Sequence, residues 1–223
     1  ERGMVYESYA DKAQELLTAT ILRKDPNGNI FVRIGQGNDA SDAVLRTSEQ
    51  IPGEEFFVDD RVKVFVMEVN KEARGPVVTL SRIHPGLVRR MFELEVPEIA
   101  DGIVLVKGVS REAGSRTKIA VYSRDEDVDA VGACIGAHGA RIASIVEELR
   151  GEKVDIVQYS EIPEEYVASA LAPAEVLSVT LTGDRVCRVQ VNPDQLSLAI
   201  GKEGQNARLA ARLTGFKIDI KAD

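Results

Sequence analysis

The feature that most constrains the fold of this 223-residue chain is an internal duplication. An isoleucine followed by a Gly-x-x-Gly segment occurs at 135–139 and again 65 positions later, at 200–204. Further along, the sequence GEKVDI at 151–156 parallels GFKIDI at 215–220 at an offset of 64, so one residue is gained or lost inside the second helix or its cap. A repeat of this length predicts two copies of one structural unit.

Each copy has the order strand, strand, helix, tight turn, helix, strand. The apolar spacing on both sides of the glycines is typical of two short helices that each bury one face. The predicted strands cover 103–109, 117–122 and 154–157 in the first copy, and 176–181, 186–191 and 217–221 in the second. Strands and helices in this order predict an α+β unit.

The Gly-x-x-Gly turns are suited to holding the backbone of a nucleic acid. Glycine accepts dihedral angles that other residues avoid and lets another chain approach closely. The first amides of the following helix lack intrahelical partners and lie at the positive end of the helix dipole, so they can bind phosphate. One such turn alone would more simply be a helix–turn–helix corner with a glycine cap. Two copies in matching contexts favour a clamp for a nucleic-acid strand.

The N-terminal third has a different pattern, with short strands and little helix. Five predicted strands cover residues 18–23, 29–34, 43–46, 61–69 and 77–82. They are separated by turn signals such as DPNG at 25–28. This pattern predicts a small closed barrel of the OB type. We therefore expect a multidomain chain, with a connector at 1–15, an all-β barrel at 16–83, and two α+β units at 84–160 and 161–223.

Composition excludes several classes of function. The chain has 36 acidic and 28 basic residues, a net charge of −8, and each of the segments 1–82, 83–160 and 161–223 is acidic by itself. Nucleic-acid binding would therefore depend on a local groove and on main-chain amides rather than on a strong overall field. The sequence has no run approaching the ~20 apolar residues of a membrane helix and no signal peptide at its start. We expect a cytoplasmic monomer that does not bind a membrane.

Catalytic and metal-binding patterns are missing from the sequence. Cys134 and Cys187 are too few for a disulfide framework or a two-plus-two zinc site, and we expect both to be small core residues in a reducing compartment. Gly201-Lys202 is followed by Glu203, so the second turn does not have the Ser or Thr of a Walker P-loop. The sequence favours a non-enzymatic binding module without a cofactor or metal.

Each repeat resembles a KH domain, with Ile135-Gly136-Ala137-His138-Gly139 and Ile200-Gly201-Lys202-Glu203-Gly204 in the place of the family's Ile-Gly-x-x-Gly loop. The chain ends just after the last strand of the second repeat. The extra helix of each unit is therefore expected before its strands, as in type II KH domains. Residues 85–94 and 163–171 are the candidates.

The barrel resembles an S1 domain in its closing half, in the segments 57–66 and 75–82. S1 domains usually have several aromatic residues on the second strand, whereas this strand has only Phe31. Each stacked base contributes about 1–3 kcal/mol, so this barrel alone is expected to add little RNA affinity. Phe31 is interpreted slightly more readily as a core residue than as a base-stacking residue.

An S1-like barrel followed by two type II KH units is similar to the RNA-binding core of the NusA family of bacterial transcription elongation and termination factors. The resemblance covers about residues 15–223 and is close at 131–136, 149–156 and 192–202. It implies a function in pausing, termination and antitermination. The implied partners are single-stranded nascent RNA, including leader RNA of ribosomal operons, and RNA polymerase. The family binds polymerase through an N-terminal domain that is absent from this sequence, which is expected to be an excised fragment.

The KH resemblance assigns RNA-binding residues in both repeats. The glycines would admit the RNA backbone, Lys202 would neutralise a phosphate, and apolar residues, Ala207 among them, would form the floor under the bases. The predicted set is Ile135, Gly136, Ala137, His138, Gly139, Arg141 and Ile142 in the first repeat, and Ile200, Gly201, Lys202, Glu203, Gly204, Gln205, Asn206 and Arg208 in the second.

Two other functions remain open from the sequence. One is the RNA-binding region of a ribonuclease such as polynucleotide phosphorylase, which a phosphate-dependent nuclease assay would reveal. In that family a single KH domain precedes the S1 domain, which is the reverse of the order here. The other is a ribosome-associated protein with KH units, which would be retained on ribosomes rather than on polymerase.

Overall fold

A computed structural model describes residues 2–71 and 74–223. The chain divides into two compact units, one comprising Glu1–Met91 with Glu148–Gly151 and the other Phe92–Glu147 with Glu152–Asp223. Both repeats lie mainly in the second unit. Within the described residues, no helix is long and apolar enough to cross a membrane.

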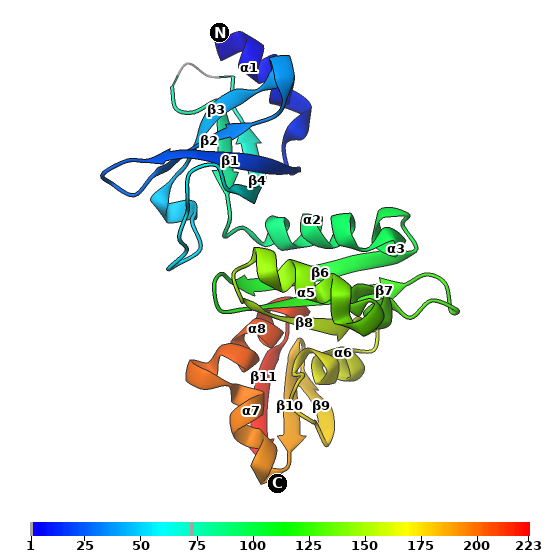
Figure 1. The fold of residues 1–223 in the computed structure, drawn as a ribbon. Helices are drawn as coiled ribbons and strands as arrows, with labels where there is room; N and C mark the ends of the chain where they lie inside the picture. The colour runs from blue at the N-terminus through cyan, green and yellow to red at the C-terminus, as the bar shows by residue number, and fades with distance from the viewer. Residues whose placement is uncertain (1, 72–73) are drawn as a thin grey trace. The chain divides into compact units, whose positions relative to one another are not determined.

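The first unit contains a five-stranded antiparallel sheet that is nearly closed into a barrel (Figure 1). Its strands follow the order β3-β2-β1-β4-β5, and β3 lies beside β5. The alternation of buried and exposed residues along β2 points one face into an apolar core. The strands are β1 (Leu16–Lys24), β2 (Ile30–Ile34), β3 (Ser41–Leu45), β4 (Arg61–Val69) and β5 (Val78–Ser81), with short 3₁₀ helices η2 (Gly37–Asp39) and η3 (Thr47–Glu49). The predicted all-β barrel is confirmed.

The segment predicted as a connector contains helix α1 (Arg2–Tyr9) and the short helix η1 (Ala10–Lys12). Tyr9 is 3% exposed and belongs to the barrel core. Its hydroxyl donates to the carbonyl oxygens of Ile34 at 3.0 Å and Asp39 at 2.5 Å. This segment therefore contributes a buried side chain to the barrel.

The two repeats have the same chain order and the same sheet topology. In the first repeat, the central strand β7 pairs antiparallel with β6 and parallel with β8. In the second, the central strand β10 pairs antiparallel with β9 and parallel with β11. The first repeat comprises α2 (Pro85–Glu95), α3 (Pro97–Ala100), β6 (Val104–Glu112), β7 (Arg116–Ser123), α4 (Ala130–Ile135), η4 (Ala137–Gly139), α5 (Ala140–Glu148) and β8 (Lys153–Gln158). The second comprises α6 (Pro163–Ala170), β9 (Ser178–Gly183), β10 (Val186–Val191), η5 (Pro193–Gln195), α7 (Leu196–Ile200), η6 (Lys202–Gly204), α8 (Gln205–Thr214) and β11 (Lys217–Ala222).

Helices α2 and α6 precede the strands, as the type II prediction requires, so both α+β KH folds are confirmed. The one-residue difference between the repeats lies in the turn that follows α5 in the first repeat and α8 in the second. Arg150 and Gly151 both have positive φ there, at 61° and 92°, whereas Gly215 alone, at 76°, ends α8. The first repeat therefore uses two left-handed residues where the second uses one.

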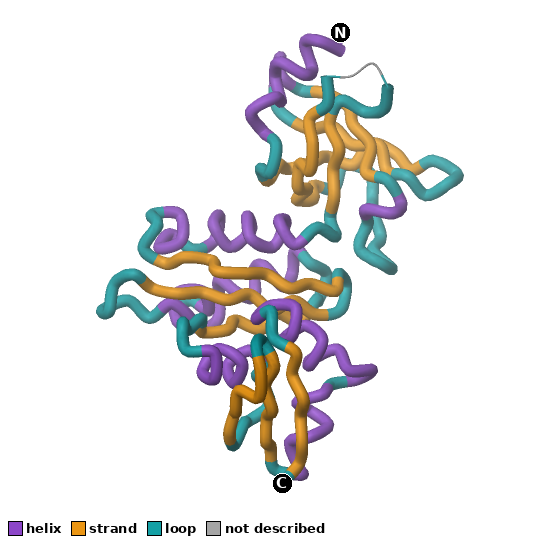
Figure 2. Tube along the Cα trace, turned by 180° about the vertical axis from the view of Figure 1, so that it is seen from behind, coloured by secondary structure: helices purple, strands orange, loops and turns teal. Residues whose placement is uncertain are grey.

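The two repeats pack against each other. Ala120 and Val157, on the sheet of the first repeat, belong to the same buried cluster as Tyr166, Val167 and Leu171 of the second. Helix α8 lies beside β6, and α6 lies beside β8. Figure 2 shows the two three-stranded sheets as separate groups of strands with helices between them. The spacing between the two Gly-x-x-Gly loops is therefore set by a shared core.

A buried carboxylate anchors the turn between β6 and β7. Glu152 is 1% exposed. It accepts hydrogen bonds from the Arg111 guanidinium at 3.0 Å, the Gly114 amide at 2.7 Å and the Thr117 hydroxyl at 2.6 Å. The Arg111 side chain is also fully buried. Because every donor comes from the two strands or their turn, Glu152 fixes the shape of this hairpin.

A second buried charge connects the two repeats. Lys118 is 0% exposed, and its Nζ donates to Asp155 Oδ2 at 2.9 Å and to the carbonyl of Ala172, in the second repeat, at 2.7 Å. Burial lowers the pKa of Lys118, while Asp155 acts in the opposite direction. The pair Lys118–Asp155 therefore satisfies a buried amine at the contact between the repeats.

Candidate nucleic-acid interface

The two Gly-x-x-Gly loops have nearly the same backbone conformation. We call residues 136–139 the first clamp and residues 201–204 the second clamp. The first glycines have φ/ψ of 79°/171° and 79°/168°. The third residues have 55°/25° and 56°/26°. The last glycine has a φ of 73° in the first clamp and 75° in the second. The duplication seen in the sequence is therefore a duplication of loop geometry.

The two glycines of each clamp serve different purposes. A Cβ on Gly136 would lie 2.6 Å from Cγ of Arg141, and one on Gly201 would lie 2.7 Å from the backbone nitrogen of Asn206. In contrast, a Cβ on Gly139 would meet nothing within 4 Å, and one on Gly204 would meet only Arg208 Nη1, at 3.9 Å. The first glycine lets the following helix pack closely, whereas the second leaves the surface of the loop open.

We expect Gly201→Ala to be clearly more destabilising than Gly204→Ala. Both substitutions place alanine at positive φ, but Gly201 has a conformation that is essentially restricted to glycine and its Cβ would clash with backbone. The cost at Gly204 should be about 1–2 kcal/mol, and that at Gly201 about 3 kcal/mol or more. Thermal unfolding of the two variants tests this prediction, and equal losses would contradict it.

Apolar side chains are exposed beside each clamp. Ile135 is 39% exposed and Ile200 is 37% exposed, each immediately before the first glycine. Leu198, on α7, is 42% exposed. Ile142 is half-buried on α5. Exposed aliphatic residues therefore lie next to each open glycine loop.

The middle residues of both clamps face solvent. Ala137, His138, Lys202 and Glu203 are all exposed. Within the described part of the chain, Lys202 has no carboxylate partner, so its ammonium group is available to a phosphate. His138 and Glu203 occupy the same position, so the two clamps differ in charge at this point.

Arg141 is held by a carboxylate next to the first clamp. Its Nη1 lies 3.0 Å from Oε1 of Glu98, on α3, and donates to the Ala133 carbonyl at 2.6 Å. The side chains of Arg141 and Glu98 are 31% and 29% exposed. The stem of Arg141 covers Gly136, while its charged end caps a carbonyl of α4.

Arg208 is held in a similar way next to the second clamp. Its Nε and Nη2 donate to the two carboxylate oxygens of Glu112 at 2.8 and 2.9 Å, and its Nη1 donates to the carbonyl of Glu203 at 3.0 Å. Gln205 donates to Ser115 at 2.7 Å and to Glu112 at 3.3 Å. The hydrogen bond from Arg208 lowers the pKa of Glu112, and the same bond raises the pKa of Arg208. The second clamp is thus attached to the β6–β7 hairpin of the first repeat.

Asn206 lies beneath the second clamp rather than on its surface. It is 3% exposed, and its Nδ2 donates to the carbonyls of Leu171 and Ala199 at 3.0 Å each. It occupies the position in its repeat that Arg141 occupies in the first, and each caps a carbonyl near the end of the preceding helix. The neighbouring Ala207 is half-buried. Asn206 therefore supports the loop from within the unit.

Sequence reasoning missed Glu98 and Glu112. They are 43 and 96 residues from the arginines that they hold. Neither carboxylate occurs in a motif, and the pairing depends on how α3 and β6 pack in the second unit. A pattern along the chain contains no signal for contacts of this kind.

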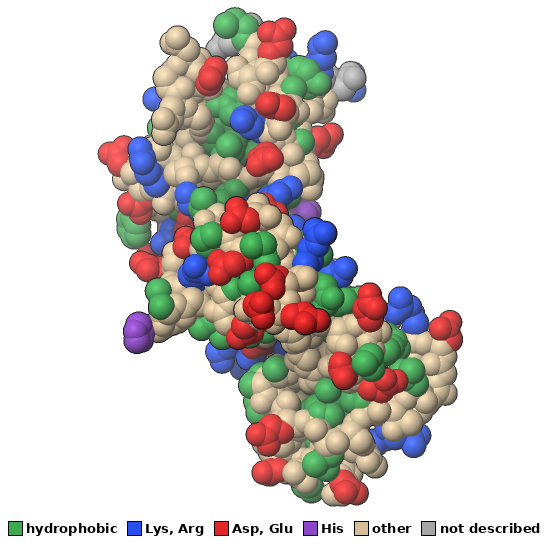
Figure 3. Space-filling model, turned by 90° about the vertical axis from the view of Figure 1, so that its right-hand side faces the viewer, with side chains coloured by type: hydrophobic (Ala, Val, Ile, Leu, Met, Phe, Trp, Pro, Cys, Tyr) green, Lys and Arg blue, Asp and Glu red, His purple; other side chains and the backbone are tan. Residues whose placement is uncertain are grey.

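The surface charge agrees with the composition. On the face drawn in Figure 3, acidic side chains lie over the whole surface and are densest in its middle, and basic side chains are scattered among them. This face offers no broad basic surface for a nucleic-acid backbone, so any binding there would require specific local contacts.

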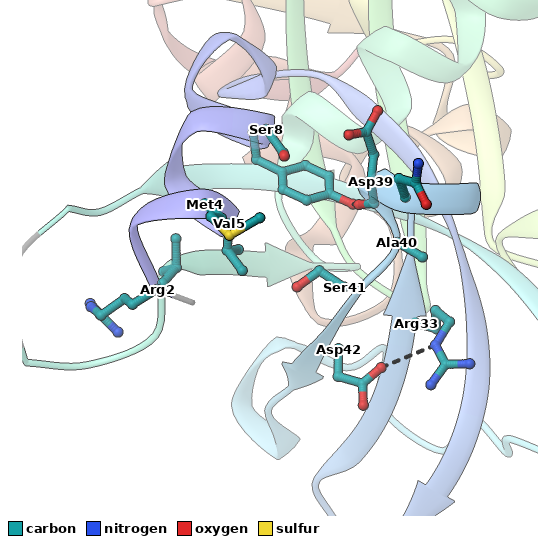
Figure 4. A pocket seen from close by; sticks show the side chains of 12 residues that line it. Arg2, Met4, Val5, Ser8, Arg33, Asp39, Ala40, Ser41 and Asp42 are labelled. Atoms are coloured by element: carbon teal, nitrogen blue, oxygen red, sulfur yellow. Dashed lines mark hydrogen bonds and ion pairs between the residues drawn. The ribbon is translucent and has the colours of Figure 1, made fainter.

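Cavities also lie among the described residues of the barrel unit. One of about 770 Å³ lies between α1 and β3 (Figure 4), where Arg33 pairs with Asp42 at 3.1 Å and Arg2 donates to the Gly75 carbonyl at 2.9 Å. Another, of about 410 Å³, is lined by Phe31 among others. The Phe31 ring is half-buried, with the Arg23 guanidinium 3.8 Å from its centroid. Arg33 and Asp42 of the first cavity are therefore paired with each other, and Arg23 occupies one face of Phe31.

Both cysteines are free and buried in the second unit. Burial raises the pKa of the Cys134 thiol to about 12 and also raises that of Cys187. Thiols held in the neutral form at physiological pH are poor nucleophiles and poor metal ligands. These side chains act as small core residues, as predicted.

Comparison with known proteins gives a consistent match. Residues 82–159 match the NusA-like first KH domain and residues 163–223 match the NusA-like second KH domain. Over its whole length the chain is 50% identical to the transcription termination/antitermination protein NusA of Halalkalibacterium halodurans, of which it covers 57%. It is 49% identical to the Bacillus subtilis protein of the same name, covering 59% of it, and 48% identical to that of Mycobacterium tuberculosis, covering 66%. In each case the match includes 100% of this chain but only part of the relative.

Proposed function

Because this chain belongs to the NusA family of transcription termination/antitermination proteins, we propose that it binds single-stranded RNA, with one strand running across both clamps. The observation that carries the proposal is the repetition of the clamp backbone in two packed units. A KH unit holds about four nucleotides of an unpaired strand. Two units fixed by a shared core could therefore hold one longer strand in an extended conformation.

Within each clamp, main-chain amides of the exposed loop would contact the RNA backbone. Lys202 would neutralise a phosphate at the second clamp, and His138 would contact RNA at the equivalent place in the first. The exposed Ile135 and Ile200 would form part of the floor under the bases. Asn206 would act indirectly by supporting Gly201. The proposed activity is binding, without a catalytic step.

At the level of the whole protein, we propose that the bound RNA is nascent transcript, including leader RNA of ribosomal operons. Binding of this RNA would modulate pausing, termination and antitermination. RNA polymerase is the protein partner that we propose. Copurification with transcription complexes rather than with ribosomes tests this assignment.

Unpaired RNA should bind more tightly than duplex of the same sequence, because the clamp requires splayed bases. The logarithm of the affinity should fall with the logarithm of salt concentration with a slope of about −2, since two or three phosphates each contribute about 0.7. Fluorescence anisotropy of labelled single-stranded and duplex RNA across a salt series measures both quantities. A preference for duplex, or a much steeper slope, would contradict the proposal.

A further inference from the structure

The arginines beside the two clamps are already engaged by carboxylates in the free protein. Arg141 is held by Glu98 and Arg208 by Glu112, at 3.0 and 2.8 Å. Arg212 lies 3.6 Å from the same Glu112. Within the residues that the structure describes, Lys202 is the clamp cation without such a partner. Most of the positive charge at the interface is therefore compensated.

These ion pairs contribute little to the stability of the fold. Their side chains are 25–40% exposed, and exposed ion pairs contribute only about 0–1 kcal/mol. The two arginines also occupy different positions in their repeats, and their carboxylates come from different elements, α3 and β6. In both repeats an arginine beside the clamp is neutralised by a carboxylate, but the residues that form the pair occupy different positions.

The geometry at Arg208 shows what a phosphate would meet. The two carboxylate oxygens of Glu112 accept from Nε and Nη2 in a fork. A phosphate uses the same bidentate geometry on a guanidinium. A phosphate and Glu112 would therefore compete for one edge of Arg208, which also contacts the loop through the Glu203 carbonyl.

We propose that Glu98 and Glu112 limit the affinity for RNA by keeping the clamp arginines neutralised, so that RNA phosphate has to displace a carboxylate to use either arginine. The inference depends on the proposed RNA binding. By reducing the sequence-independent share of the affinity, the two carboxylates make binding depend more on contacts to the bases, such as those on the apolar floor.

The test compares Glu112→Gln and Glu98→Gln with Asp184→Asn in the full 223-residue chain. Asp184 is exposed in the β9–β10 turn, and its substitution changes the net charge by the same amount. The probes are labelled U-rich, A-rich and C-rich single-stranded RNAs of about 12 nucleotides, enough for two KH units. Glutamine keeps the size and a hydrogen-bonding oxygen, and circular dichroism checks that each variant is folded.

Each glutamine variant should bind every probe about fivefold more tightly at 0.1 M salt, because one more phosphate contact adds about 0.7 to the salt slope. The ratios of affinity among the three probes should stay the same, because the added contact is to phosphate and carries no sequence information. Asp184→Asn should change affinity by less than about twofold, since Asp184 is exposed and salt screens interactions between exposed charges.

Glutamine variants that match Asp184→Asn, or that bind RNA more weakly, would overturn the inference. Lys202→Asp is measured in parallel. If it weakens binding while the glutamine variants have no specific effect, RNA binding at the clamp stands and only the role of the carboxylates is wrong. If the unsubstituted chain binds none of the RNAs, both proposals are wrong.

Discussion

Aspartate substitutions in both clamps together, at Ala137, His138 and Lys202, should reduce the affinity for single-stranded RNA by about 100-fold or more. Each clamp would then present negative charge to a phosphate at an exposed loop. A loss of about 1.4 kcal/mol per clamp corresponds to tenfold, and like charges placed against each other cost at least that much. The substitutions in one clamp alone should give about a tenfold loss, because the other clamp still binds.

The control for added negative charge is Thr180→Asp with Thr182→Asp, on exposed positions of β9, which changes the net charge by as much as the substitutions in one clamp alone. This variant should bind RNA nearly as well as the unsubstituted chain. Anisotropy titrations with one RNA long enough to span both clamps measure all the affinities. An unchanged affinity in every clamp variant would exclude the clamps as the binding site.

The second large effect is expected from Glu152→Ala. Removal of this carboxylate leaves the fully buried guanidinium of Arg111 without it, together with the Thr117 hydroxyl and the Gly114 amide. Breaking a buried ion pair on one side typically costs about 3–5 kcal/mol. Denaturant unfolding should show a loss of this size, with a smaller loss for Glu152→Gln, which retains an acceptor.

Glu147→Ala is the control, since Glu147 is exposed on α5. Its cost should lie within about 0.5 kcal/mol of zero. The hairpin anchored by Glu152 carries Glu112 and Ser115, which hold Arg208 and Gln205. Loss of Glu152 should therefore also weaken the attachment of the second clamp. A cost below about 1 kcal/mol for Glu152→Ala would show that this buried network contributes little.

Much of this architecture could be predicted because it is encoded in short-range patterns. The expected strand at 186–191 agrees with β10, and the expected helix at 85–94 differs from α2 by one residue. Apolar periodicity, turn residues and proline at a helix start are all local signals. The clamps could be located because two copies of one motif occur at a constant spacing.

The remaining features depend on contacts between distant residues. The burial of Tyr9 in the barrel core depends on carbonyl groups contributed by Ile34 and Asp39. From the sequence, Asn206 is expected on the surface of the loop. In the structure it is buried and donates to the carbonyl of Leu171, at the end of α6. Glu152 looks like any other acidic residue until the β6–β7 hairpin closes over it. Polar residues of this kind follow no period, so their roles become visible only in the packed unit.

The most direct test of the account is a crosslinking map of one RNA strand bound to the chain, with a photoreactive nucleotide placed at each position in turn. The account predicts crosslinks in the segments 135–142 and 200–208, from two groups of nucleotides in a fixed order along the strand. Crosslinks confined to other segments, with both clamps unlabelled, would contradict it.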